Sequence, residues 1–402
     1  MSPFLHAHAT HPDWRFALGL VAAQLDAQRV ARPGITPTLG WVYFTDHFAA
    51  QASALLDEVQ RRWPGVRWVG GVGVGVAASG VEYFDEPGLV LMLADLPRER
   101  FRVFSGTQPL GGFAAHTAQV HADPSTPDLP ALLRDLADRT TTGYLFGGLA
   151  SSRTRTVQVA DAVLEGGLSG VAFDAEVAIV SRVTQGCQPV GPMRRITASS
   201  GNAIETLDDK PALDCLLEDL GLPGRDPREA LPKIRQTLVG LSDPAERSDA
   251  GPARRGAFGP DTRVRHLVGL DSARRGIAIA DIADAGLQLA FCQRHTAAAR
   301  RDLVRICAEI REEVEPEMTL PAVVPADAQE AASSPGRGIA GAIYVSCAGR
   351  GGPHFGAPSA ELAIVQHALG EVPLVGFFAG GEIARHHLYG YTGVLTVFPS
   401  GA

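Results

Sequence analysis

Hydrophobic positions near the start of the chain alternate between short apolar runs and stretches with helical spacing. Residues 39–44 form a compact apolar run that predicts a strand, and Leu55 and Val59 then lie on one face of a predicted helix. A second strand is predicted at 66–69, and it leads directly into a glycine cluster. Strand, helix and strand in this order predict a crossover between two parallel strands.

The same order of elements returns near the other end of the chain. Residues 339–346 predict a strand, residues 359–369 a helix, and residues 372–375 a second strand that again ends in glycines. The two glycine-containing segments match at four equally spaced positions, which are Val66, Val69, Gly70 and Gly75 in the first and Val372, Val375, Gly376 and Gly381 in the second. The sequence therefore predicts an internal duplication.

The middle of the chain does not continue this alternation. Short extended runs at 157–164, 170–173 and 176–183 predict an antiparallel meander, and helices are predicted at 211–220 and 303–314. The predicted fold class is therefore α/β with mixed α+β features, in which two related domains contain mixed sheets covered by helices.

The predicted domain limits follow the two copies of the repeated order. An N-terminal helical arm occupies residues 1–36, a first domain residues 37–208, and a second domain residues 209–400. The segment 242–261 is expected to be a long exposed loop, and 321–337 is expected to be a flexible connection because it is rich in proline, serine and small residues.

Charge and composition narrow the class of function. A formal net charge of -8 and a pI near 5.8 argue against a nucleic-acid partner or an anionic membrane surface. The longest uncharged run, 68–81, is too short to cross a bilayer, and the first residues lack the pattern of a signal peptide. We therefore expect a cytoplasmic protein without membrane insertion.

Histidines and cysteines do not predict a metal site or a cofactor. The five cysteines are scattered without a C-x-x-C pair, so neither a disulfide framework nor a zinc site is indicated. His6, His8 and His11 lie near the start without a nearby carboxylate or cysteine to complete a metal shell, and a mobile terminus explains them better.

The segment Tyr344 to Gly352 places reactive side chains where a predicted strand ends. Cys347 could react as a thiolate beside Arg350, although a cysteine at such a position is also commonly a small buried hydrophobe. The forked guanidinium of Arg350 could bind a ligand carboxylate or phosphate, or it could form an internal ion pair with Glu361 or Glu382.

Glu382 is the strongest single candidate for a ligand-binding residue. It follows Gly380 and Gly381 in an otherwise apolar stretch, where an acid is costly unless it is exposed, paired or used. It would accept an amine or orient Arg350. His386 follows closely and is a candidate proton carrier.

In the N-terminal copy, the position of the Cys-Ala-Gly-Arg turn reads Thr-Asp-His-Phe, and its glycine loop lacks an acid. The C-terminal copy would therefore supply the polar groups of a ligand site. Gly70 and Gly75 of the first copy would form a wall, and Gly376 would contribute backbone on the other side.

These residues resemble the FIST family, whose name stands for F-box and intracellular signal transduction. The segments S-C-A-G-R-G (346–351) and V-P-L-V-G-F-F-A-G-G-E-I-A (372–384), together with Glu361, resemble the FIST C-terminal domain. The segments G-W-V-Y-F-T-D (40–46) and V-G-G-V-G-V-G (69–75), with the Gly147-Gly148 strand edge, resemble the FIST N-terminal domain. The resemblance extends from about Leu39 to Phe398.

The resemblance implies a sensory module that binds a small ligand such as an amino acid. No kinase, cyclase or F-box-like segment is recognised beyond the two domains, so a freestanding sensor would pass its signal to a separate partner protein. Two alternatives stay open: an enzyme or redox protein that uses Cys347, and a protein-interaction scaffold in which the motifs only build turns. We favour ligand binding over catalysis.

Overall fold

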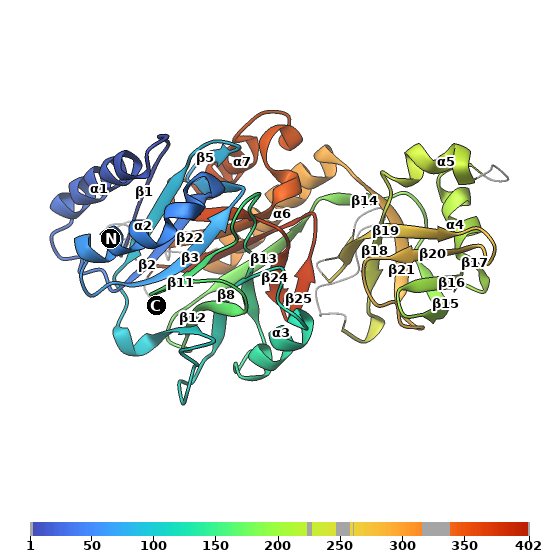
Figure 1. The fold of residues 1–402 in the computed structure, drawn as a ribbon, viewed down its shortest axis with the longest axis horizontal. Helices are drawn as coiled ribbons and strands as arrows, with labels where there is room; N and C mark the ends of the chain where they lie inside the picture. Colours follow the sequence, from blue (N-terminus) through green and yellow to red (C-terminus); the bar gives the residue numbers. More distant parts are fainter. Residues whose placement is uncertain (1–2, 223–226, 247–257, 260, 316–337, 401–402) are drawn as a thin grey trace, which may run out of the picture. The chain divides into compact units, whose positions relative to one another are not determined.

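The computed structural model describes residues 3–222, 227–246, 258–259, 261–315 and 338–400. The chain divides into two compact units, which Figure 1 shows coloured along the sequence. Unit 1 contains residues 1–184, 300–388 and 392–402, and unit 2 contains residues 185–299 and 389–391. The fold is a mixture of helices and mixed β-sheets, as the sequence predicts.

Three six-stranded sheets form unit 1. The first has the order β1 (Phe4–Ala9), β6 (Leu89–Ala94), β2 (Leu39–Thr45), β3 (Arg67–Gly73), β10 (Gln158–Ala160) and β11 (Val163–Leu164). The second has the order β25 (His387–Tyr389), β24 (Glu382–Arg385), β9 (Leu145–Leu149), β8 (Thr117–Ala122), β12 (Leu168–Phe173) and β7 (Phe101–Ser105). The third has the order β13 (Val180–Gln185), β26 (Thr392–Pro399), β22 (Ile339–Cys347), β23 (Leu374–Ala379), β4 (Gly75–Ala78) and β5 (Val81–Phe84).

Each sheet of unit 1 has a parallel pair of strands at its centre. The pairs are β2 with β3, β8 with β9, and β22 with β23, and each pair is connected through a helix, α2 (Ala52–Arg62), α3 (Leu129–Asp138) or α7 (Ala360–Leu369). The two crossovers predicted from the sequence are confirmed. A third crossover has the same plan, and the internal duplication of the sequence stays a prediction.

The strand that follows each parallel pair leaves for another sheet. After β3 the chain forms β4, which pairs with β23; after β9 it forms β10, which pairs with β3; and after β23 it forms β24, which pairs with β9. The three sheets are therefore joined in a cycle. As a result, Glu382 on β24 lies directly opposite Gly148 of β9.

One glycine in each parallel pair is required by the close approach of the neighbouring strand. A Cβ atom there would lie 1.7 to 2.0 Å from a backbone carbonyl oxygen, and two of the three glycines have positive φ. These contacts join Gly70 to Val42, Gly147 to Val120, and Gly376 to Tyr344. Gly70 and Gly376 thus occupy the same register position in their pairs, where close packing requires glycine, and a ligand-binding role for them stays a prediction.

The N-terminal segment is more ordered than the sequence suggested. Helix α1 (Trp14–Ala31) is present, with Asp13 capping it by accepting a hydrogen bond from the Arg15 N–H at 2.7 Å. The preceding residues form β1, an edge strand paired with β6, so the expectation of a mobile terminus around His6 and His8 is wrong. The alternating pattern of Phe4–Ala9 buries every second residue and leaves both histidines partly buried.

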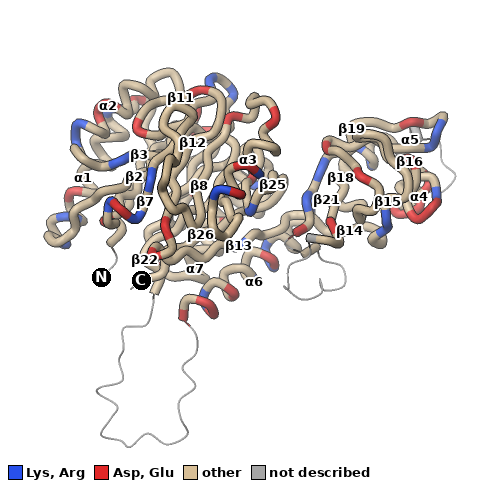
Figure 2. Tube along the Cα trace, turned by 90° about the horizontal axis from the view of Figure 1, so that it is seen from below, with Lys and Arg blue, Asp and Glu red and all other residues tan. Residues whose placement is uncertain are grey.

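Helix α6 (Thr296–Val314) confirms the helix predicted at 303–314. Figure 2 shows acidic and basic residues spaced along it, while Leu303, Ile306 and Ile310 are buried on its other face. Of the predicted meander, only β10 and β11 pair as neighbours in the chain; the rest is wrong, because β12 pairs with β7 and β8, and β13 lies beside β26.

The strands of unit 2 form one sheet that closes on itself. Its sheet has the order β14 (Cys187–Pro189), β21 (Gln288–Arg294), β15 (Arg194–Ser200), β16 (Ala203–Leu207), β20 (Gly276–Ile279), β19 (Arg263–Asp271) and β18 (Leu238–Ser242), and β18 pairs again with β21. Strand β17 (Lys210–Pro211) pairs with β16 and leads into the predicted helix α4 (Ala212–Asp219), and α5 (Pro227–Ile234) follows.

The predicted domain limits run in chain order, whereas unit 1 takes segments from both ends of the chain. The boundaries at residues 36 and 208 therefore stay predictions of sequence organisation. Most of the loop predicted at 242–261 and all of the connection predicted at 321–337 lie outside the described residues.

Candidate functional site

A group of buried polar side chains lies at the end of β22, and we call it the strand-end cluster. Strand β22 ends at Cys347, and a short 3-10 turn, Ala348–Arg350, carries Arg350 back into the protein. Helix α7 places Glu361 in its first turn, and β24 begins at Glu382. The cluster consists of Tyr344, Ser346, Cys347, Arg350, Glu361, Glu382 and Thr392.

Arg350 and Glu361 form an ion pair that is almost completely buried, since each is 1% exposed. The Nε and Nη2 atoms of Arg350 donate to Glu361 Oε1 at 2.8 and 2.6 Å. Tyr344 donates its hydroxyl to the same oxygen at 2.7 Å, and Ser346 donates to Oε2 at 2.9 Å. Burial works against the charge of Arg350, but the adjacent Glu361 carboxylate outweighs it and raises the arginine pKa.

Of the two roles predicted for Arg350, the internal pair with Glu361 is therefore present. Two of its three guanidinium nitrogens are used in this pair. The third, Nη1, is buried and has no hydrogen-bond partner.

Glu382 is fully buried, and its two oxygens differ in their surroundings. Oε2 accepts hydrogen bonds from the backbone N–H and the hydroxyl of Thr392, at 3.1 and 2.6 Å, whereas Oε1 has no partner. Burial raises the pKa of Glu382 to about 8, although Thr392, Arg350 and Cys347 all act to lower it. Glu382 is therefore mostly a neutral carboxylic acid at pH 7.

Cys347 is the member of the cluster that reaches toward solvent. It is partly exposed, whereas the other four cysteines of the chain are buried. Its thiol lies close enough to Glu382 to lower the pKa of that carboxyl group.

Glu82 on β5 is a further acid of this region that sequence reasoning missed. It is 6% exposed, and its Oε1 accepts a hydrogen bond from the Gly352 N–H at 3.0 Å, which fixes the loop after Arg350. Burial and the charge of Glu361 raise its pKa. The missed signal is an acid within the apolar stretch 81–84. Sequence reasoning did not select Thr392 because it is separated from Glu382 along the chain. It did not select Tyr344 and Ser346 because the residues around them are those of an ordinary strand.

The remaining predicted residues lie around the cluster or away from it. The Gly381 carbonyl accepts a hydrogen bond from the Leu149 N–H at 2.8 Å, and a Cβ atom at Gly380 would make ordinary contacts at 3.8 to 3.9 Å. A side chain at Gly75 would contact Phe84 and Phe378 at 2.6 and 2.9 Å. His386 follows β24, and its ring lies against that of His387 with centroids 3.9 Å apart. A ligand-binding role for these residues stays a prediction.

Comparison with known proteins identifies the family. The FIST N domain matches residues 38–210, and the FIST C domain matches residues 212–385. The chain therefore belongs to the FIST family, whose domains are associated with ligand binding and sensory signalling.

Similar proteins occur in mycobacteria. An uncharacterized protein of Mycobacterium tuberculosis is 29% identical over 409 residues, which cover 97% of this chain and 98% of that protein. An uncharacterized protein of Mycobacterium bovis is 29% identical over 413 residues, which cover 97% of each chain.

Two further findings apply to the described residues only. No helix among them is both long enough and apolar enough to cross a membrane. Within the same residues, no group of three or more histidine, cysteine, aspartate or glutamate side chains is arranged to hold a metal ion.

Proposed function

We propose that this protein is a freestanding cytoplasmic sensor that binds a small amino-acid-like metabolite at the strand-end cluster and passes its signal to a separate protein. The observation that carries the proposal is a pair of buried polar atoms without partners, Arg350 Nη1 and Glu382 Oε1. A buried polar group left unpaired costs about 1–3 kcal/mol, so two in one cluster favour a site that a ligand completes.

The equivalent strand ends of the other two parallel pairs support this choice. In register, Thr45 of β2 and Asp123, directly after β8, correspond to Cys347. Asp123 accepts hydrogen bonds on both oxygens, from Ser125 and from the Gly166 N–H.

The acid after β2 is also satisfied within the protein. Asp46 follows Thr45 and accepts three hydrogen bonds from Arg153, from its backbone N–H, its Nε and its Nη2, at 2.8 to 2.9 Å. The acids of both other strand ends are therefore paired on both oxygens, whereas Glu382 of the strand-end cluster has one oxygen without a partner.

The two unpaired atoms suit the two charged groups of an amino acid. Arg350 Nη1 would donate to the ligand carboxylate, while Glu361 keeps the guanidinium in place. Glu382 would accept the ligand ammonium group through Oε1. Because Glu382 is mostly protonated at pH 7 when the site is empty, an ammonium ligand would displace its proton, so binding would release close to one proton and would strengthen as the pH rises toward 8.

Isothermal titration calorimetry with a panel of amino acids and their decarboxylated and deaminated analogues tests the proposal. We expect a ligand that needs both groups, and titrations at pH 7 in buffers of different ionisation enthalpy should show release of close to one proton. A ligand present at 100 times its Kd should stabilise the protein by about 2.7 kcal/mol.

Variants locate the site without breaking the Arg350–Glu361 pair. Glu382→Gln keeps the shape of the side chain and should weaken binding and abolish proton release. Glu371→Gln is the matched control, because Glu371 is exposed. Binding that Glu382→Gln leaves unchanged, or the lack of any ligand in the panel, would contradict the proposal.

A further inference from the structure

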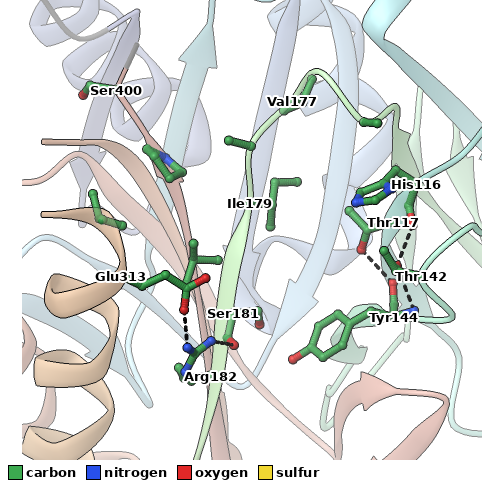
Figure 3. Close-up of a pocket in the computed structure, with 15 residues that line it drawn as sticks. His116, Thr117, Thr142, Tyr144, Val177, Ile179, Ser181, Arg182, Glu313 and Ser400 are labelled. Atoms are coloured by element: carbon green, nitrogen blue, oxygen red, sulfur yellow. Dashed lines mark hydrogen bonds and ion pairs between the residues drawn. The ribbon is translucent and has the colours of Figure 1, made fainter. Parts of the chain in front are cut away.

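A cavity lies in unit 1, and none of the strand-end cluster residues is among those that line it. Its volume is about 610 Å³, which falls in the range of small-molecule sites. Figure 3 shows its walls: Val177 and Ile179 come from the segment before β13, His116 and Tyr144 lie on one side, and Glu313 of α6 lies on the other.

The walls of the cavity combine an apolar surface with polar side chains. The segment 175–180 supplies most of this surface, and Val314 and Pro399 extend it. Several polar groups of the wall are already paired with backbone: Thr117 donates to the Tyr144 carbonyl at 2.6 Å, and Thr142 donates to the His116 carbonyl at 2.6 Å. These hydroxyl groups hold the wall in place.

The charges around the cavity balance one another. Arg182 forms ion pairs with Glu313 and, at 3.4 Å, with Glu309, and its Nη1 donates to the Ser181 carbonyl at 3.0 Å. Arg182 and Glu313 are the two charged residues among those that line the cavity, and they pair with each other. Burial raises the pKa of Tyr144, which keeps its hydroxyl neutral. The cavity therefore has no excess charge to bind an ion.

We infer that this cavity is a binding site for a neutral small molecule that has an apolar face and a hydrogen-bonding group. The apolar part would lie against Val177 and Ile179, and the polar group would face the side that carries His116, Tyr144 and Ser181. A charged ligand is disfavoured, because it would lose hydration against apolar walls and would gain no unpaired counter-charge. This site is distinct from the buried cluster proposed above, which takes charged groups.

Three ligands with the same ring system test the charge preference: 2-naphthol, 2-naphthoate and 2-naphthylmethylamine. Titration calorimetry of the full chain at pH 7 should show binding of 2-naphthol, with the anion and the cation at least tenfold weaker. No binding of 2-naphthol at 1 mM, or equal or tighter binding of either charged ring, would overturn the inference.

Two substitutions that fill the cavity locate the binding. Ile179→Trp should weaken 2-naphthol at least tenfold, whereas Ile282→Trp, at an exposed isoleucine of unit 2, should leave it unchanged. Should Ile179→Trp not fold, Ala175→Trp tests the same point, because Ala175 is exposed at the cavity wall. Binding that survives the folded variant would place 2-naphthol elsewhere and refute the assignment.

Discussion

The raised pKa of Glu382 should make the stability of the protein depend on pH in a predictable direction. The ordinary pKa of a glutamate is 4.5, and burial raises that of Glu382 to about 8 in the folded protein. The folded state therefore holds a proton between these values that the unfolded chain has lost. The contribution of Glu382 is fully present below pH 4.5, falls as the pH rises, and is lost once the pH passes about 8.

The magnitude follows from the size of the shift. Each pKa unit corresponds to about 1.4 kcal/mol, so the loss accumulates at about 1.4 kcal/mol per pH unit and reaches about 5 kcal/mol over the whole range. Glu382 is fully buried, so solvent screening does not reduce this figure strongly. A ligand that pairs with the ionised Glu382 would oppose the loss.

The measurement compares the wild type with Glu382→Gln by urea denaturation at pH 5, 6, 7, 8 and 9. Glutamine cannot titrate, so the difference in free energy of unfolding isolates Glu382 from the other ionisable groups. We expect the free energy of unfolding of Glu382→Gln to rise steadily relative to that of the wild type between pH 5 and 8, with no further change in the difference above pH 8. A difference that is flat across this range, or that moves in the opposite direction, would refute the assignment of a neutral buried acid.

Three further predictions follow from packing, pairing and exposure. Arg350→Met should lower the free energy of unfolding by about 3–5 kcal/mol, because it leaves Glu361 as a buried charge without its cation. The double variant Arg350→Met with Glu361→Leu should recover part of this loss in the same denaturation assay. Gly70→Ala should destabilise the protein by more than about 3 kcal/mol or prevent folding, since the new Cβ would lie 1.9 Å from a carbonyl oxygen. The control is Gly106→Ala, whose Cβ would have no atom within 4 Å; in thermal melts it should change stability by less than about 1 kcal/mol. Cys347 should be the first cysteine that iodoacetamide labels in the native protein, as mass spectrometry of peptides will show; faster labelling of any of the four buried cysteines would contradict the exposure described here.

The sequence predicts well those parts of the fold that depend on patterns of residues close together in the chain. The crossovers at 39–73 and 339–379 were predictable because apolar runs, helical spacing and glycines follow one another within about 40 residues. The match of Gly70 with Gly376 was also predictable, since the same close contact between strands demands glycine in both places. The third pair escaped notice because β8 and β9 share little more than Gly147 with the others.

The exchange of strands between sheets could not be predicted from these patterns. Strand β24 pairs with β9, which lies more than 230 residues away in the sequence. Neither segment contains a pattern that identifies the other as its pairing partner. For the site, sequence correctly favoured Glu382 as an unusual acid and weighed the Arg350–Glu361 pair. It could not reveal which oxygen of Glu382 lacks a partner, because Thr392 reaches it only through the packing of β24 against β26.

The same exchange of strands suggests how a ligand at the cluster would be sensed. Glu382 belongs to the second sheet through β24, while its hydrogen-bond donor Thr392 and the turn that carries Arg350 belong to the third. A change in the charge of Glu382 therefore acts where two sheets are joined, and a ligand that ionises it strengthens the hydrogen bonds from Thr392. Strand β9 is followed in the chain by β10 of the first sheet, so strand pairing and chain continuity connect β24 with all three sheets. The proposed sensor would need a connection between the ligand and a distant surface, and we propose that the order of the strands provides it.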